Sequence, residues 1–340
     1  MSQKNQLQKW LRKNLFDTWY NSILTVVCLL VLIWGTTSIL TWVFAQAQWE
    51  VIGVNLQLFL VGRFPQQMYW RLWLVLFIIL GLSCLTWGSL TRKLPKTINN
   101  WLPLGWTISF PIILWLIGGG LGLETADTNL WNGLLLTLVT AITSIVLSFP
   151  LGVLLALGRQ SRMFIVRNFC VLYIEIIRGL PLIGILFIAQ VMLPLVLPPD
   201  ISLDRVLRGI AGLTLFSAAY LAENVRGGLQ SIPRGQFEAG KAIGLNSALI
   251  MLLIILPQAL RAVIPALVGQ FIGLFKDTSL LSIVGLLELT GISRSILAQP
   301  EFLNRYAEVY LFVGLLYWIF CYSMSLASKR LEKQLNVGHK

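Results

Sequence analysis

Long runs of uncharged, mostly apolar residues alternate with short charged segments along this 340-residue chain. The first run lies between Asp17 and Glu50, and its apolar part, 22–44, is long enough as a helix to cross a hydrocarbon core of about 30 Å. Uncharged runs of this kind follow at 72–91, 106–121 and 130–157. Further apolar stretches at 171–195, 209–225, 258–275 and 307–327 each carry one or two charged residues near one end. The pattern predicts an all-α integral membrane protein with about eight transmembrane helices. Prolines and an embedded arginine interrupt the seventh run, so the helix count stays open around 257–282.

Basic residues are concentrated in the segments that an eight-span topology places on one side of the membrane. These residues are Lys4, Lys9, Arg12 and Lys13; Arg92, Lys93 and Lys96; Arg159, Arg162 and Arg167; Arg226, Arg234 and Lys241; and Lys329, Arg330, Lys333 and Lys340. Cytoplasmic loops carry an excess of Lys and Arg, so the pattern predicts that both termini are cytoplasmic.

The amino-acid composition excludes several kinds of chemistry. Charged residues make up 12% of the chain, against about 25% in soluble domains. The only histidine is His339, and Cys28, Cys84, Cys170 and Cys321 form no CxxC pair, so we expect no metal site and no histidine-dependent catalysis. The net charge of +12 follows the topology, and no basic stripe with interleaved aromatic residues predicts nucleic-acid binding.

The segment 231–260 is long for a simple connection between the sixth and seventh spans, and the topology places it in the cytoplasm. A short helix is predicted at 236–243, because Pro233 and Gly235 precede it and Gly244 with Asn246 can end it. A short surface helix joined rigidly to transmembrane helices can act as a lever on a soluble partner.

The same segment also contains a partial match to a phosphate-binding loop. Gly235, Gly240 and Lys241 fit GxxxxGK, but Ala242 stands where such a loop needs Ser or Thr for magnesium. The preceding Ile-Pro-Arg also breaks the strand that the loop must follow. We therefore expect no nucleotide binding by this chain.

Motifs in the second half of the chain resemble those of a known family. Glu238-Ala239-Gly240, Gly244 and IILP at 254–257 resemble the EAA signature of ABC importer membrane subunits, with Gly240 in place of the second alanine. YIEIIRGLPL at 173–182 resembles YxExxRGTPL of polar amino-acid permeases, with Leu180 in place of threonine. YLAENVRGG at 220–228 and KDTSLLS at 276–282 extend the likeness to the histidine, glutamine and general L-amino-acid importers.

The resemblance covers about 130–331 and implies an architecture. Residues 129–331 would form a five-helix type I ABC importer permease core, with a cytoplasmic coupling loop at about 231–257. Residues 1–128 would form an N-terminal extension with three further transmembrane helices, as in the general L-amino-acid subgroup. Residues 332–340 would be a cytoplasmic tail.

The same resemblance implies a permease subunit of an ATP-driven importer for polar L-amino acids in the bacterial cytoplasmic (inner) membrane. ATP and Mg would be bound by a separate ATPase subunit, with no cofactor in this chain. A second homologous permease, as a heterodimer, and an extracytoplasmic amino-acid-binding protein would complete the complex. The residues expected to couple this chain to the ATPase are Glu238, Ala239, Gly240, Gly244 and Pro257.

Two pairs of opposite charges lie near the predicted cytoplasmic span ends. Glu175 with Arg178, and Glu223 with Arg226, are each spaced to meet on one helix face. We expect ion pairs that hold the helix ends; part of a gate and direct substrate contact are the alternatives.

Charged residues also follow the seventh span, where Lys276 and Asp277 precede an apolar segment that can re-enter the membrane. An amino-acid zwitterion needs a cationic and an anionic partner, which Lys276, Asp277 and the amide of Gln270 can supply. A self-satisfied Lys276–Asp277 ion pair is the equal alternative.

Two other classes of membrane protein compete with the importer. An ion-gradient-driven secondary amino-acid transporter would usually show an inverted repeat, and none is seen between the first three spans and the last five. A channel or structural subunit would need no ATP. The motifs leave open which amino acids are carried and whether the permease pair is a homodimer or a heterodimer.

Overall fold

The computed structural model describes residues 10–11, 13–91, 95–198 and 200–335. Several predictions made above lie outside these residues: the positions of Lys4, Lys9, Arg12, Arg92, Lys93, His339 and Lys340, and the tail beyond 335. The chain divides into two units, Met1–Gly53 and Val54–Lys340, which are described separately.

One long apolar helix dominates the first unit. Helix α2 (Trp19–Thr41) starts at Thr18, whose hydroxyl accepts a hydrogen bond from the Asn21 amide, and it continues as the π-helical turn η1 (Trp42–Gln46). The most apolar 18-residue window within Trp19–Gln46 has a mean hydropathy of 2.4, and the whole stretch contains no charged residue. This confirms the first predicted span.

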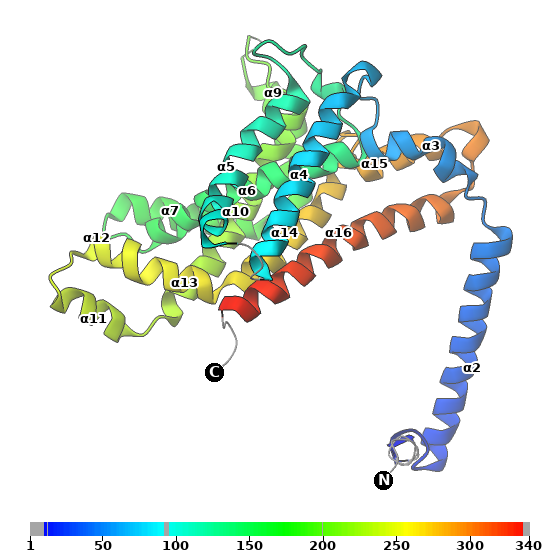
Figure 1. The fold of residues 1–340 in the computed structure, drawn as a ribbon, viewed down its shortest axis with the longest axis horizontal. Coiled ribbons are helices and arrows are strands. Elements are labelled where there is room, and N and C mark those ends of the chain that lie inside the picture. Colours follow the sequence, from blue (N-terminus) through cyan, green and yellow to red (C-terminus); the bar gives the residue numbers. More distant parts are fainter. Residues whose placement is uncertain (1–9, 12, 92–94, 199, 336–340) are drawn as a thin grey trace. The chain divides into compact units, whose positions relative to one another are not determined.

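The second unit consists mainly of helices, which are drawn in Figure 1. Helix α3 (Glu50–Val61) leads from the first unit into the second. The further elements are η2 (Gln66–Met68), α4 (Tyr69–Leu90), α5 (Lys96–Gly118), η3 (Thr128–Leu130), α6 (Gly133–Arg159), α7 (Phe164–Gly179), α8 (Leu182–Phe187), η4 (Ile188–Met192), α9 (Leu193–Val196), α10 (Arg205–Ser231), α11 (Arg234–Ala242), α12 (Ser247–Leu249), η5 (Ile250–Ile255), α13 (Leu256–Ala262), α14 (Ile264–Asp277), η6 (Thr278–Ser282), α15 (Leu289–Leu297), η7 (Pro300–Phe302) and α16 (Tyr306–Leu335).

The membrane spans follow the prediction in number and differ in shape at two places. Among the described residues, six helices are long and apolar enough to cross a membrane, and two bent pairs bring the total to as many as eight. The predicted spans 171–195 and 258–275 each contain a break: α7 meets the segment Leu182–Val196 at 104°, and Ser247–Ala262 meets Ile264–Ser282 at 62°.

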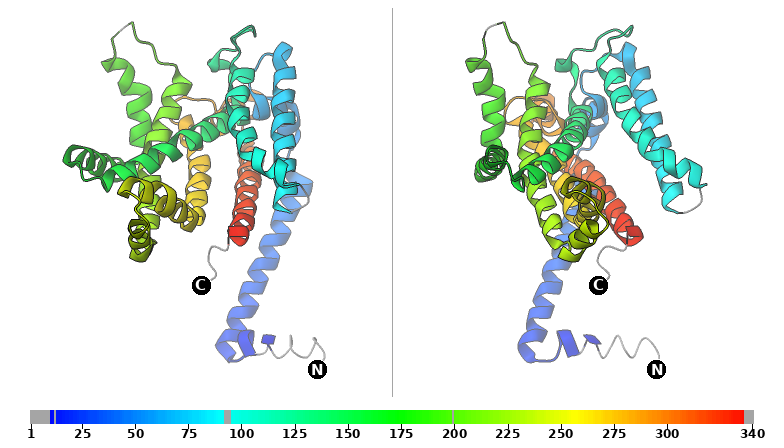
Figure 2. Two further views of the ribbon diagram at one scale, coloured as in Figure 1. Left: turned by 60° about the vertical axis from the view of Figure 1, so that its left-hand side comes forward. Right: turned by 90° about the vertical axis from the view of Figure 1, so that its left-hand side faces the viewer.

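Proline chemistry accounts for both breaks. Pro181 holds Leu180 in an extended conformation, because a residue before proline is disfavoured in the helical region. Pro265 stands in the first turn of α14, where its missing N–H group costs nothing, so the chain restarts as a new helix after Val263. Figure 2 shows α7 lying crosswise to the upright helices.

Helices α6 and α10 form the tightly packed centre of the second unit. Gly152 of α6 lies so close to α10 that a Cβ atom there would be 2.6 Å from Cβ of Leu221. The face of α6 around it carries buried small polar residues, among them Thr140, Ser144 and Ser148. Small residues let transmembrane helices approach closely, which is how membrane bundles gain packing energy.

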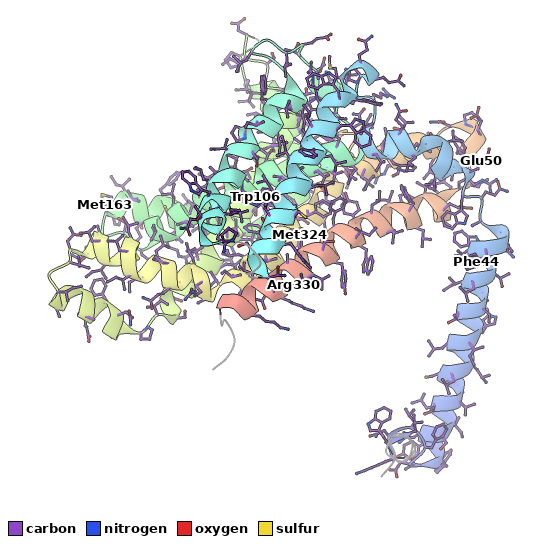
Figure 3. All side chains as sticks on the ribbon, in the orientation of Figure 1. Phe44, Glu50, Trp106, Met163, Met324 and Arg330 are labelled. Carbon is purple, nitrogen blue, oxygen red and sulfur yellow. The ribbon has the colours of Figure 1, made fainter. Side chains whose placement is uncertain are left out.

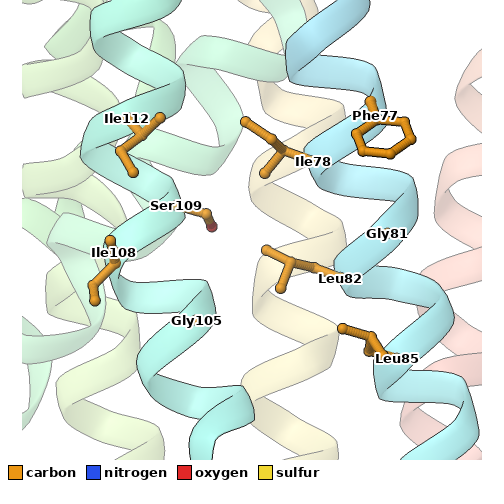
Figure 4. Close-up of a pocket in the computed structure, with 9 residues that line it drawn as sticks. All are labelled: Phe77, Ile78, Gly81, Leu82, Leu85, Gly105, Ile108, Ser109 and Ile112. Atoms are coloured by element: carbon orange, nitrogen blue, oxygen red, sulfur yellow. The ribbon is translucent and has the colours of Figure 1, made fainter.

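Helices α4 and α5 form a hairpin with an apolar groove of about 420 Å³ between them. Figure 4 shows this groove, where Gly81 of α4 and Gly105 of α5 leave space between larger apolar side chains. In the last turn of α4, next to the groove, the guanidinium of Arg330, labelled in Figure 3, lies 3.6 Å from the centroid of the Trp87 ring. This contact ties α4 to the end of α16.

Candidate functional site

The predicted lever helix is present as α11, Arg234–Ala242. It ends at Gly244, whose φ of +82° is the left-handed conformation that glycine adopts without strain. The Leu245 amide donates back to the Gly240 carbonyl over 3.1 Å and satisfies a carbonyl of the last turn. Asn246 then caps the next helix by accepting from the Leu249 amide. The prediction of a helix stopped by Gly244 is confirmed.

Helix α11 is fastened to the helix that follows it. Gly240 is buried, and a Cβ atom there would be 2.8 Å from Cγ1 of Ile250 in η5. The amide of Gln258 in α13 donates to the side-chain oxygen of Gln236 over 3.1 Å. Phe237 packs into the apolar cluster that contains Ile250. These contacts let a force on α11 pass directly to η5 and α13.

The predicted coupling residues fall into two groups. Glu238 and Ala239 are exposed on α11, and no ion pair of Glu238 is found within the described part of the chain. Pro257 is exposed in the first turn of α13. Gly240 instead faces inward onto Ile250, so it brings α11 and η5 close together rather than presenting a surface to a partner. Gly244 permits the turn that ends α11.

Five charged residues from three helices form one network, here called the charge cluster: Arg159, Glu175, Arg178, Glu223 and Arg226. Glu223 of α10 is its centre and contacts Arg226 at 2.8 Å, Arg159 at 2.8 Å and Arg178 at 3.5 Å. Arg159 also contacts Glu175 at 3.1 Å. The predicted Glu223–Arg226 pair is therefore present within a larger network.

The predicted Glu175–Arg178 pair is wrong in its partners. Glu175 contacts Arg159 at the end of α6, and Arg178 contacts Glu223 on α10 and stacks on the Tyr220 ring at 5.6 Å. Both residues lie on the last turns of α7. Helix α7 crosses α6 and α10 there, so the oppositely charged residues of α6 and α10 are closer partners than those within α7. The cluster thus joins the ends of α6 and α7 to α10.

The predicted substrate residues lie on α14 and are not gathered into one cluster. Gln270 and Asp277 are two helical turns apart on one face, and the intervening Gly273 has open space where a Cβ would point. Lys276 is exposed and Asp277 half-buried, with no ion pair between them within 4.0 Å. The alternative of a self-satisfied Lys276–Asp277 pair is therefore not what the structure contains.

Sequence reasoning missed Glu288, which is fully buried at the start of α15. Its carboxylate accepts hydrogen bonds from the amides of Thr290 and Gly291, each over 2.9 Å, and from the Tyr317 hydroxyl of α16 over 3.1 Å. Burial raises the pKa of Glu288 to about 7, although these hydrogen bonds act in the opposite direction. An acidic residue directly before the apolar segment 289–297 is the helix-start signal that could have indicated it.

Metal coordination has no group of ligands to support it in the described residues. No three His, Cys, Asp or Glu side chains are grouped there so that they could hold an ion. The four cysteines are free, and Cys170 is buried, close to where a Cβ on Gly158 would stand.

The sequence is similar to a known protein family and to individual proteins. The family described as binding-protein-dependent transport system inner membrane component matches residues 148–337. The inner membrane amino-acid ABC transporter permease protein YhdY of Escherichia coli (strain K12) is 40% identical over 97% of this chain and 93% of its own length. The glutamate/glutamine/aspartate/asparagine transport system permease protein BztC of Rhodobacter capsulatus is 37% identical over 98% of this chain and 94% of its own.

A solved structure agrees with these sequence relatives. The chain in the crystal structure of an amino acid ABC transporter with histidines superposes with a TM-score of 0.54 at 28% identity, over 59% of this chain and 92% of that one. The family match covers more than half of the sequence, and the relatives extend it to nearly all of the rest. The chain therefore belongs to the binding-protein-dependent transport system inner membrane components, as a multi-pass, non-catalytic permease subunit of an ABC importer.

Proposed function

We propose that this chain forms part of the translocation path of an ATP-driven importer for polar L-amino acids and couples to the ATPase through α11. The observation that carries this proposal is the attachment of α11 to η5 and α13, through Gly240 against Ile250 and the Gln236–Gln258 hydrogen bond. An exposed carboxylate, Glu238, stands on the free side of this attached helix.

Motion of α11 would reach the membrane core through specific contacts. Gly228 of α10 lies where a Cβ would be 2.6 Å from the Ala259 carbonyl oxygen of α13, so a displacement of α13 toward α10 would push on the α10 backbone. The charge cluster then links α10 to α6 and α7. ATP-driven closure of two ATPase subunits would pull the α11 helices together and switch the path between its two openings.

The charge cluster fits the role of holding helix ends together better than that of binding substrate. Glu223 already has three arginine partners and Glu175 has one. Rearrangement of these contacts during the α10 movement would make the cluster part of a cytoplasmic gate.

The proposed function requires partner proteins that supply ATP hydrolysis, the rest of the path and substrate delivery. A separate ATPase would bind ATP and Mg, a second homologous permease would complete the path as a heterodimer, and an extracytoplasmic binding protein would deliver the substrate. Residues 1–128 would form an N-terminal extension, 129–331 the permease core and 332–340 a tail, with both termini in the cytoplasm.

Polar amino acids fit the open face of α14. Gln270 and Asp277 can hydrogen-bond or pair with the ammonium group of a zwitterion, and the exposed Lys276 with a carboxylate. The names of YhdY and BztC, which mention amino acids and the acidic amino acids with their amides, agree with this substrate class.

The proposal is tested by reconstituting the chain with its ATPase, second permease and binding protein in liposomes. We expect amino-acid uptake that requires ATP, and a loss of at least about tenfold in Glu238→Ala while the complex still assembles. Glu301→Ala, which removes an exposed carboxylate on η7, is the matched control and should leave uptake unchanged. Uptake driven by an ion gradient with no ATPase present would instead identify a secondary transporter.

A further inference from the structure

Glu288 lies where three helices meet, at the end of α6 and α10 that is remote from α11. Its carboxylate caps the N-terminus of α15 and receives the Tyr317 hydroxyl from α16. From α6, the Thr137 hydroxyl lies 3.5 Å from the same carboxylate and accepts the Leu289 amide over 3.1 Å. No arginine or lysine contacts this carboxylate within the described residues.

The hydrogen bonds continue from Glu288 toward α14. The Tyr317 hydroxyl that donates to Glu288 also lies 3.5 Å from the hydroxyl of Thr278, a fully buried residue. Thr278 directly follows Asp277 and begins η6, so its position sets how α14 ends. The Phe275 ring packs against the Tyr317 ring at 5.4 Å, which gives the same junction an apolar side.

The backbone just before Glu288 is held from two further elements. The first amide of α6, on Gly133, donates to the Leu287 carbonyl over 2.9 Å. The Arg205 guanidinium, at the start of α10, donates to the Gly285 carbonyl over 2.9 Å. The segment between η6 and α15 is therefore fixed on both sides, and Glu288 is the titratable group at its end.

We propose that Glu288 is a protonation-dependent positioning residue: through Tyr317 and Thr278 it holds the end of α14 that carries Lys276 and Asp277. Uptake would then respond to pH on the side of the membrane opposite α11. This inference rests on the proposed function for its effect on uptake, but the structural effect of protonation does not depend on it.

The direction of the effect follows from the surroundings of the carboxylate. Burial raises the pKa of Glu288 to about 7, so the folded junction favours the protonated form. The stabilisation by this proton is fully present below the unfolded-state pKa and is lost as pH rises through about 7. The protonated fraction falls about tenfold between about pH 6 and about pH 8.

No charged group on the neighbouring elements forms an ion pair with Glu288 in the described residues, so the pH response is assigned to Glu288 itself. On α15, Arg294 is exposed; on α14, Lys276 and Asp277 lie beyond Thr278; and on α16, Glu308 lies more than two turns before Tyr317. Helix α6 contributes only the Thr137 hydroxyl, since its one charged residue, Arg159, is at the opposite end. None of these residues forms an ion pair with Glu288 in the part of the chain described.

The experiment measures the thermal unfolding midpoint of the purified full chain from about pH 5.5 to about pH 8.5. It also measures ATP-driven uptake by the complex in liposomes while the pH on the side opposite α11 is varied over the same interval. For the native chain we expect both to fall as pH rises through about 7, with uptake lowered several-fold. Glu288→Gln should make both profiles flat across this interval, because it holds the neutral form. Glu301→Gln, an exposed carboxylate, should keep the native profiles.

A second variant tests the role of Glu288 protonation if Glu288→Gln fails to assemble. The Tyr317 hydroxyl donates to the carboxylate and so favours ionisation, and it is also the link from Glu288 to Thr278. Tyr317→Phe should therefore move the unfolding transition to higher pH and remove most of the pH dependence of uptake. Native profiles in both variants would overturn the proposal, and so would a change in the unfolding profile with no change in the pH dependence of uptake. Absence of ATP-driven uptake together with a shifted unfolding profile would refute the transport function and leave the protonation effect standing.

Discussion

Glu223 illustrates how a single residue organises the charge cluster. Its side chain is 15% exposed and accepts contacts from three arginines on three helices, whereas the Glu175 side chain is 56% exposed and contacts Arg159 alone. Partly buried charges lose more when a partner is removed than exposed charges do, because the remaining charge cannot be solvated fully. The two carboxylates should therefore differ in importance although their motifs look alike.

This difference predicts the outcome of two conservative substitutions. Glu223→Gln removes the anion between three guanidinium groups and should lower the free energy of unfolding by roughly 1–3 kcal/mol. Glu175→Gln should lower it by about 0–1 kcal/mol. Thermal unfolding of the two purified variants checks this. Equal losses would mean that the cluster does not depend on Glu223.

At the scale of elements, the attachment of α11 depends on the absence of a side chain at Gly240. The Ile250 side chain occupies the space where a Cβ would stand, while Gly235 on the same helix has nothing within 4 Å of that position. The departure of this motif from EAA thus has a local explanation, since the close contact between α11 and η5 uses the space that the second alanine would fill.

A pair of glycine substitutions tests this contact. Gly240→Val should force α11 away from η5, at a cost of about 1–3 kcal/mol, and should lower uptake more than ATPase activity because the lever is loosened. Gly235→Val, with open space around it, is the control for the loss of glycine on the same helix. The ratio of amino acid transported to ATP hydrolysed is the measurement; an unchanged ratio in Gly240→Val would contradict the lever.

At the scale of the whole molecule, α11 and α15 lie at opposite ends of the α6–α10 pair. Helix α11 directly follows the end of α10, whereas α15 contacts the first turns of α6 through Thr137 and Gly133. Helix α6, with 27 residues, is about 40 Å long and can cross the membrane between the two. The geometry therefore puts α11 and α15 on opposite sides, whichever side each faces.

Cysteine labelling tests this arrangement and its orientation together. In a chain whose native cysteines are replaced by Ser or Ala, a membrane-impermeant maleimide should label Arg294→Cys on α15 in intact spheroplasts. It should label Lys241→Cys on α11 only after permeabilisation. Both positions are exposed, so accessibility alone cannot separate them. Labelling of Lys241→Cys from outside would invert the proposed topology.

Much of the architecture follows from the sequence because the bilayer restricts the options for apolar segments. A run of about 20 apolar residues in lipid must form a helix, since its backbone groups have no other partners. The spans, the α11 helix and its stop at Gly244 could therefore be predicted locally. The motif at 238–257, together with those at 173–182, 220–228 and 276–282, likewise indicated the family without any three-dimensional information.

Contacts between residues of distant helices depend on how the helices pack in three dimensions. The break at Pro181 turns α7 across α6 and α10, and this changes the partners of Glu175 and Arg178 from each other to Arg159 and Glu223. Glu288 is an ordinary acidic residue in the sequence, and its burial arises because α6, α15 and α16 converge on it. Helix formation depends on neighbours in the chain, but ion pairing and desolvation depend on neighbours in space, which the sequence pattern does not specify.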